Sequence, residues 1–313
     1  METLSKENRG YFMGIAMILV ILHHLCLRLE DSWHLDSFPF SIFYWGQIGV
    51  DVFFFASAYG CCASWEKNSW WWYLLRRIKR IYPQYILFLL IVLVWFYADS
   101  SVLHRFKMAA VSLVGIAPIY RMGVNIEWYI PSLLMMYILL PFVFMGLSRA
   151  HKRGQVLILL VVVLFSPLLL KYIPIYYAFV ARWPVILCGV IAYLNRKDLY
   201  FLTRLFAVVM LLSLTTREEM MIHSLMIPLL LTALSSIELK NLPLEKVFSF
   251  CGKHSLEIFL AQTITTQFVM KHYYWGEKWL SLLIVMGITI VIASLFWGVQ
   301  YGFDTIEKRF NSH

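Results

Sequence analysis

The segment GYFMGIAMILVILHHLCLRL, residues 10–29, decides the fold class of this chain. Apart from His23, His24 and Arg28, its residues are apolar or glycine. As an α-helix rising 1.5 Å per residue, it would span about 30 Å, the thickness of a bilayer's hydrocarbon core. Met1 to Arg9 are polar and mixed in charge, and no small-residue cleavage site follows, so we expect a retained transmembrane helix.

Comparable apolar runs recur along the whole chain. Of its 313 residues, 61% are hydrophobic and 14% charged, with a mean hydropathy of +0.71, whereas a soluble domain carries about 25% charged residues. So little charge cannot cover a soluble globule of this size. We therefore predict an all-α integral membrane protein forming one membrane domain, residues 1–313. About ten helices should cross the membrane, near Gly10–Leu29, Ser41–Ala63, Pro83–Ala98, Glu127–Leu147, Gln155–Leu170, Ala178–Leu194, Phe201–Leu214, Met220–Ile237, Ser255–Met270 and Trp279–Tyr301.

The basic residues orient these spans. With the N-terminus in the cytoplasm, 18 of the 27 Lys and Arg residues lie in cytoplasmic segments: Lys6, Arg9, Lys67, Arg76, Arg77, Lys79, Arg80, Arg149, Lys152, Arg153, Arg196, Lys197, Arg204, Lys240, Lys246, Lys253, Lys308 and Arg309. This bias follows the positive-inside rule and predicts that both termini are cytoplasmic. Topology also accounts for the formal charge of +9, so we expect no nucleic-acid partner.

The apolar stretch from Met108 to Tyr120 is not counted as a span, because a crossing there would place Arg149–Arg153 outside the cytoplasm. It has about 13 residues and contains Gly115 and Pro118, which is typical of a re-entrant or interfacial segment. We expect it in an outer loop running from Asp99 to Asn125.

In two predicted spans, ionisable residues are candidates for chemistry. An ionised side chain at the centre of a membrane helix costs about 2.5–3.5 kcal/mol on insertion scales, so such residues are candidates for function. His23 and His24 lie about fourteen residues into the first helix, in the outer half of the membrane. Because adjacent helical positions point about 100° apart, only one of them can face a given cavity. Asp51, in the second span, is either a functional carboxylate or the hydrogen-bond partner of a neighbouring helix.

The five cysteines lack metal-ligand spacing, and we predict no metal site. A cationic run, Arg76-Arg77-Ile78-Lys79-Arg80, opens the third span. Such a run can anchor the helix at lipid headgroups. It can also clamp a polyphosphate, because guanidinium groups bind phosphate bidentately. Arg77 and Arg80 share a helical face.

Six stretches resemble, in order, acyltransferase family three, the membrane O-acyltransferases that modify bacterial surface glycans. They are Gly14-Ile15-Ala16 continuing to His23-His24; Gly49 to Ser57; Arg76 to Tyr85, with the Arg-x-x-Arg motif on Arg77 and Arg80; Trp128-Tyr129-Ile130-Pro131 with Tyr137 and Pro141; Arg182-Trp183-Pro184 with Gly189; and Gly252 to Leu260. Together they extend over most of the chain.

The resemblance implies roles for the matching positions. His24 takes the place of the family's essential histidine, which would act as general base or briefly carry the acyl group. The predicted site residues are, as catalytic groups, His24, His23, Asp51 and Ser57; for cofactor binding, Arg77, Arg80, Arg76 and Arg9; and for substrate binding, Trp128, Glu127 and Tyr129.

The chain departs from the family pattern at four positions. Ala58 follows Ser57 where glycine is common. Met13 stands eleven residues before His24, where the family usually has an arginine, and Arg9 one turn earlier can serve only the cytoplasmic mouth. Leu133 stands where the family has a carboxylate, with Glu127 nearby. Gln262 lies where the family has a further histidine.

The resemblance implies transfer of an acyl group, acetyl in the simplest case, from cytosolic acyl-CoA to a hydroxyl of an extracytoplasmic glycan or glycolipid. The protein would lie in the bacterial inner (plasma) membrane as a multi-pass protein in contact with lipid, with acetyl-CoA as a substrate and no permanently bound cofactor. Two other classes stay open. One is a proton-coupled transporter using His24 and Asp51 as relay groups, although no inverted repeat is seen. The other is a lipid-linked-sugar glycosyltransferase with Glu30-Asp31 in its first outer loop.

Overall fold

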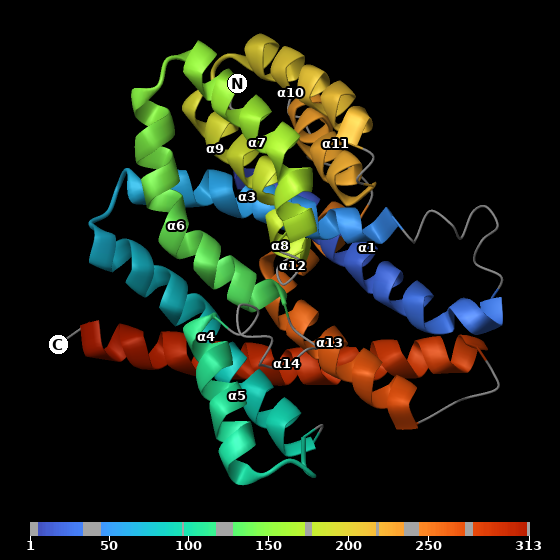
Figure 1. Ribbon diagram of the computed structural model, residues 1–313. Helices are drawn as coiled ribbons and strands as arrows, with labels where there is room; N and C mark the ends of the chain where they lie inside the picture. Colours follow the sequence, from blue (N-terminus) through green and yellow to red (C-terminus); the bar gives the residue numbers. More distant parts are fainter. Residues whose placement is uncertain are drawn as a thin grey trace.

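The computed structural model describes residues 6–33, 45–95, 97–116, 128–172, 177–216, 219–234, 244–272 and 278–311. Within these ranges every regular element is a helix, so the predicted all-α class is confirmed (Figure 1). The helices are α1 (Lys6–Trp33), η1 (Trp45–Gln47), α3 (Ile48–Trp65), α4 (Trp70–Trp95), α5 (Val102–Val114), α6 (Tyr129–Arg149), α7 (Lys152–Tyr172), α8 (Tyr177–Val180), α9 (Trp183–Leu194), α10 (Leu199–Ser213), η3 (Leu214–Thr216), α11 (Glu219–Leu234), α12 (Glu245–Lys253), α13 (Ser255–His272) and α14 (Lys278–Asn311).

In the described part of the chain, five helices are long and apolar enough to cross a membrane: Trp45–Trp65, Trp70–Trp95, Tyr129–Arg149, Lys152–Leu169 and Leu283–Glu307. Three shorter apolar helices, Ala178–Leu194, Leu199–Ser213 and Ile222–Leu234, coincide with further predicted spans. The ten crossings and the cytoplasmic location of both termini stay predictions.

Helix α3 lies at the centre of the fold and α14 at its edge. In the most apolar stretch of Trp45–Trp65, which contains α3, 67% of the residues are buried. In the most apolar stretch of Leu283–Glu307, which belongs to α14, 17% are buried. The α3 sequence Gly49-Val50-Asp51-Val52-Phe53-Phe54-Phe55 is apolar on every side except at Asp51, as is typical of a helix surrounded by protein. Helices α1, α6, α9 and α11 pack against it. The exposed apolar side chains of α14 face outward, as expected beside lipid.

Glycines allow α1 to approach its neighbours closely. A Cβ added to Gly14 would lie 1.8 Å from the Phe248 carbonyl oxygen of α12, and one added to Gly252 would lie 1.9 Å from the Gly10 oxygen. At Gly49 of α3 the added atom would lie 2.3 Å from the Ala16 oxygen. Small residues bring helix backbones together in this way in membrane proteins. The contacts place the N-terminal half of α1 between α12 and α3.

Helix α4 begins at Trp70, well before the predicted span start at Pro83, and continues through that proline. Pro83 has no N–H, so the Lys79 carbonyl one turn earlier loses its helical donor. Gln300 of α14 donates to this carbonyl from Nε2 at 3.4 Å. Pro141 of α6 frees the Tyr137 carbonyl in the same way, and the Tyr73 hydroxyl donates to it at 3.1 Å. These side chains from neighbouring helices explain how both prolines are accommodated.

Helix α5 contains most of the described part of the predicted re-entrant or interfacial segment. Its 13 residues measure about 20 Å, less than the roughly 30 Å needed to cross the hydrocarbon core. Gly115 ends it with a φ of 79°, the left-handed conformation that favours glycine. The Tyr82 hydroxyl donates to the Leu113 carbonyl at 2.6 Å and holds α5 against α4. Pro118 lies outside the described residues.

Candidate active site

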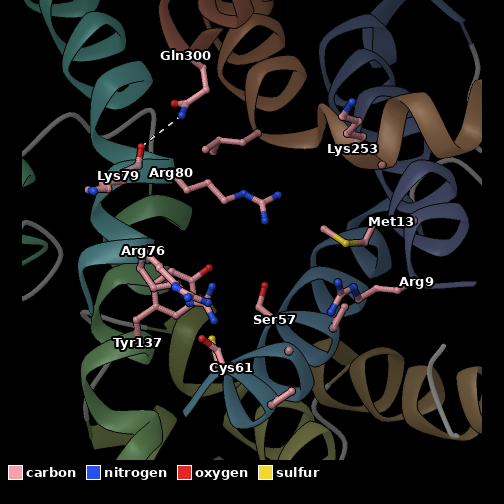
Figure 2. A pocket seen from close by; sticks show the side chains of 18 of the residues that line it. Arg9, Met13, Ser57, Cys61, Arg76, Lys79, Arg80, Tyr137, Lys253 and Gln300 are labelled. Carbon is pink, nitrogen blue, oxygen red and sulfur yellow. Dashed lines mark hydrogen bonds between the residues drawn. The ribbon is translucent and has the colours of Figure 1, made fainter. Parts of the chain in front are cut away.

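A cavity of about 940 Å³ opens among α1, α3, α4, α6, α12, α13 and α14 (Figure 2). We call it the cationic cavity, because seven basic side chains line it: Arg9, Lys67, Arg76, Arg77, Lys79, Arg80 and Lys253. Figure 2 shows Arg9 and Met13 on α1 facing Arg76 and Arg80 on α4, with Ser57 of α3 between them. The four arginines predicted to bind a cofactor therefore share one cavity.

The two arginines of the Arg-x-x-Arg motif lie in different surroundings. The Arg77 guanidinium lies between two rings, with its central carbon 5.3 Å from the ring centre of Tyr73 and 5.5 Å from that of Tyr137. Such cation–π contacts hold it in one orientation. The Arg80 side chain is exposed and extends into the middle of the cavity (Figure 2).

The acidic residues of the cationic cavity lie on α13 and α14 and have protein partners. Glu307 pairs with Lys79. Gln84 donates from Nε2 to Glu257 at 3.1 Å, and Gln300 donates to Asp304 at 2.9 Å. By contrast, none of the four arginines forms an ion pair with any residue that the structure describes. The cavity thus has a positive wall whose charge the described protein does not neutralise.

A second, smaller cavity of about 70 Å³ continues from the first, and we call it the inner chamber. The two share Met13, Ser57, Arg80, Tyr137 and Leu256, which therefore form the passage between them. The residues that line only the inner chamber are mostly apolar: Val50, Phe53, Ile81, Tyr129, Leu133, Ser255 and Phe259. Along α3, α4 and α6, the lining therefore changes from polar and cationic to apolar over a few residues.

His24 lies beyond the inner chamber, against α13. Its Nδ1 is 3.1 Å from Oε1 and 2.9 Å from Nε2 of Gln262, which is almost fully buried. Gln262 follows Phe259 of the chamber by about one helical turn. The neighbouring His23 faces η1 instead, because its Cβ lies 2.8 Å from where a Cβ on Gly46 would be. As their spacing predicts, the two histidines face different neighbours, and the described linings of both cavities do not include His24.

Asp51 forms a buried ion pair. Its Oδ1 lies 3.0 Å from Nε of Arg182, and the exposed fractions of the two side chains are 1% and 2%. The Ser224 hydroxyl donates to the same carboxylate at 2.8 Å, and Arg182 donates to the Ala178 carbonyl at 2.8 Å. The guanidinium also lies 4.9 Å from the ring centre of Trp128. Of the two uses considered for Asp51, the geometry favours partnership with neighbouring helices.

The structure thus separates the predicted site residues into groups. Arg9, Arg76, Arg77, Arg80 and Ser57 lie around the cationic cavity, and Tyr129 lies in the inner chamber. Asp51 and Trp128 meet at Arg182, and Glu127 lies outside the described residues.

Sequence reasoning gave no role to Arg182 or Gln262. Arg182 lies within a predicted span, where a cation needs a partner, and Asp51 is an acid within another span. An arginine in one predicted span and an aspartate in another already indicate that the two side chains could pair. The contact of Gln262 with His24 joins positions 238 residues apart, and no local pattern indicates it.

These features define a class of protein: a multi-pass membrane protein with a cationic cavity that leads toward a half-buried histidine. The chain belongs to acyltransferase family three, whose acyltransferase-domain pattern matches residues 11–298. It is therefore a membrane acyltransferase, and the resemblance seen in its motifs is confirmed. No curated protein and no solved structure matches the chain.

Proposed function

We propose that this protein is an O-acyltransferase that transfers an acyl group, acetyl in the simplest case, from cytosolic acyl-CoA to a hydroxyl of an extracytoplasmic glycan or glycolipid. One observation carries the proposal: a cavity lined by arginines that pair with no described acid continues into an apolar chamber that ends about one helical turn from the His24–Gln262 pair. The proposed setting is the bacterial inner membrane.

The donor site is the cationic cavity. Coenzyme A carries a diphosphate and a further phosphate, and guanidinium groups bind phosphate oxygens through paired hydrogen bonds. Arg77, held between Tyr73 and Tyr137, and the extended Arg80 supply such groups on α4, with Arg9 opposite on α1. The thioester end would pass Met13 and Ser57 to reach the inner chamber.

His24 is the proposed catalytic group. As general base it takes the proton of the acceptor hydroxyl while the oxygen bonds to the thioester carbon. The carbon–sulfur bond then breaks, and the sulfur leaves as the CoA thiol with that proton. In the alternative, His24 itself accepts the acyl group before the hydroxyl does. Gln262 suits both, because its amide can donate to Nδ1 of a neutral ring and accept from Nδ1–H of a charged one.

The remaining predicted residues take supporting roles. Ser57, in the passage, would contact the pantetheine arm of the donor as the thioester enters the inner chamber, and the Asp51–Arg182 pair would hold α3 in position for it. Trp128 and Tyr129, with Glu127, stay the proposed acceptor side of the site. Because Asp51 is occupied by Arg182 and Ser224, it is a poor relay group, which counts against the transporter alternative.

The test is acceptor-dependent release of CoA from acetyl-CoA by the purified protein in lipid nanodiscs. We expect His24→Ala to lower turnover by about 10²–10⁴-fold, the usual contribution of positioned acid–base catalysis, with acetyl-CoA binding retained. His23→Ala is the matched control, because the Cβ of His23 lies close to Gly46 of η1, and it should cost much less. Full acceptor-dependent turnover in the His24 variant would refute this mechanism.

A further inference from the structure

The inner chamber has a defined direction and depth. Helix α3 lines it from Ser57, shared with the cationic cavity, to Val50, and α6 lines it from Tyr137, also shared, to Tyr129. From one end of each segment to the other, seven and eight residue steps along the helices rise by about 10–12 Å. The chamber is therefore a short extension of the cavity, leading from the arginines toward the level of His24 and Gln262.

Large side chains line the chamber from its middle, at Phe53 and Leu133, to its far end, at Tyr129. The Tyr129 ring lies 4.9 Å from that of Phe259 and 6.3 Å from that of Phe53, measured between centres. Leu133, on the same side of α6 as Tyr129, completes the wall, and all four side chains are buried. We call Phe53, Tyr129, Leu133 and Phe259 the end wall. Its surface is suited to a hydrocarbon group rather than to a phosphate or an amide.

The size of the chamber limits what can enter. A single enclosed water molecule needs about 10–15 Å³. The chamber, at about 70 Å³, is several times that size but is far smaller than the cationic cavity, at about 940 Å³. This is enough for an acyl group of a few carbons and too little for a fatty acyl chain.

We propose that the inner chamber holds the acyl group of the bound thioester and that its end wall sets the longest chain the enzyme accepts. Phe53 and Leu133 are then specificity-determining residues. The inference rests on the proposed function, since it takes acyl-CoA as the ligand of the adjoining cavity.

The expected effect follows from the hydrophobic gain of each methylene group. A methylene that is buried improves binding about fourfold. A methylene that must displace the end wall loses this gain, and overpacking a buried site costs about tenfold or more in addition. Relative kcat/KM for CoA esters should therefore fall steeply once the chain exceeds the length of the chamber.

The experiment measures kcat/KM and binding for acetyl-, butyryl-, hexanoyl- and octanoyl-CoA with the full-length protein in nanodiscs. Phe53→Ala and Leu133→Ala should raise the hexanoyl-to-acetyl ratio by about tenfold or more, and Leu133→Phe should lower it. Phe55→Ala is the matched control. Phe55 is also a buried phenylalanine of α3, but it faces Phe206, with ring centres 6.5 Å apart, and does not line the chamber. Its ratio should equal that of the wild type.

Each result decides between the claims. Unchanged ratios in Phe53→Ala and Leu133→Ala, with acetyl transfer retained, would overturn the role of the end wall and leave the proposed function standing. A wild-type protein that binds and consumes no CoA ester would overturn the proposed function itself. If Phe53→Ala does not yield folded protein, the two Leu133 variants still decide, because their ratios are expected to move in opposite directions.

Discussion

Two arginine sites in this molecule differ in whether the protein neutralises their charge. Arg182 lies buried against Asp51, with Ser224 on the same carboxylate. Arg77 and Arg80 line an open cavity, and neither forms an ion pair with any described residue. The charge of Arg182 is balanced by a neighbouring acid, whereas the charges of Arg77 and Arg80 are balanced by no described acid.

The physical reason for this difference is solvation. A charge taken out of water loses several kcal/mol, so Asp51 and Arg182 are tolerated only as a pair with further hydrogen bonds. Arginines that border a water-filled cavity keep much of their hydration, and they can stay unpaired until an anion arrives. Charge inside this membrane domain thus joins helices at Arg182, whereas at Arg77 and Arg80 it lines a cavity and has no described counter-ion.

The largest expected effect comes from breaking the buried pair. Arg182→Ala leaves the Asp51 carboxylate buried without its partner, which typically costs about 3–5 kcal/mol of stability. We expect a large drop in the melting temperature of the detergent-solubilised protein, followed by size-exclusion chromatography. The double variant Asp51→Leu/Arg182→Met should recover much of the loss. A wild-type melting temperature in Arg182→Ala would remove the distinction between the two sites.

A middle-sized effect is expected at the cavity, on binding rather than on folding. Replacing Arg77 and Arg80 together by lysine keeps the charge and the insertion signal but loses the guanidinium fork. Acetyl-CoA affinity, measured by isothermal titration calorimetry, should fall by about 10- to 100-fold, because charge-assisted hydrogen bonds contribute about 1.5–3 kcal/mol each. Arg204→Lys, at an arginine stacked on Tyr200 outside the cavity, should bind normally. Unchanged acetyl-CoA binding in the double variant would mean that Arg77 and Arg80 serve only to anchor the topology of the helix.

The smallest effect is expected at an exposed pair, Lys152 and Asp198, whose Nζ and Oδ2 are 2.5 Å apart. The hydrogen bonds from Lys152 and from the Phe201 amide lower the pKa of Asp198 below its ordinary value. A lowered pKa adds stability above the unfolded pKa of about 3.9, and this is lost as pH falls through the folded value. Asp198→Asn should therefore lower the melting temperature slightly at pH 7 and not at all at a pH below the folded pKa. A fall in melting temperature as large as that expected for Arg182→Ala would show that burial does not determine how much an ion pair contributes to stability.

The sequence predicted the features that depend on local composition. The apolar run from Gly10 to Leu29 indicated a membrane helix, and α1 contains all of it. The spacing of Arg77 and Arg80 predicted a shared helical face, and both side chains line one cavity. Helical periodicity is local, so such predictions need only the order of residues along the chain.

The start of α4 shows where local reasoning ends. Pro83 predicted a boundary, yet the helix continues through it, because Gln300 of α14 donates to the carbonyl that the proline leaves free. Gln300 lies 221 residues from Lys79 in the sequence, so no local pattern indicates this hydrogen bond.

The sequence by itself determined that this is a helical membrane protein, which family it belongs to and which arginines and histidines are its candidate site residues. Only the tertiary structure decided that Asp51 pairs with Arg182, that Gln262 meets His24, and that Met13 and Ser57 border a passage into an apolar chamber. The physical reason is that solvation and hydrogen bonding depend on what surrounds a side chain in space. Those surroundings come from helices distant in sequence, brought together by close contacts such as Gly14 against Phe248.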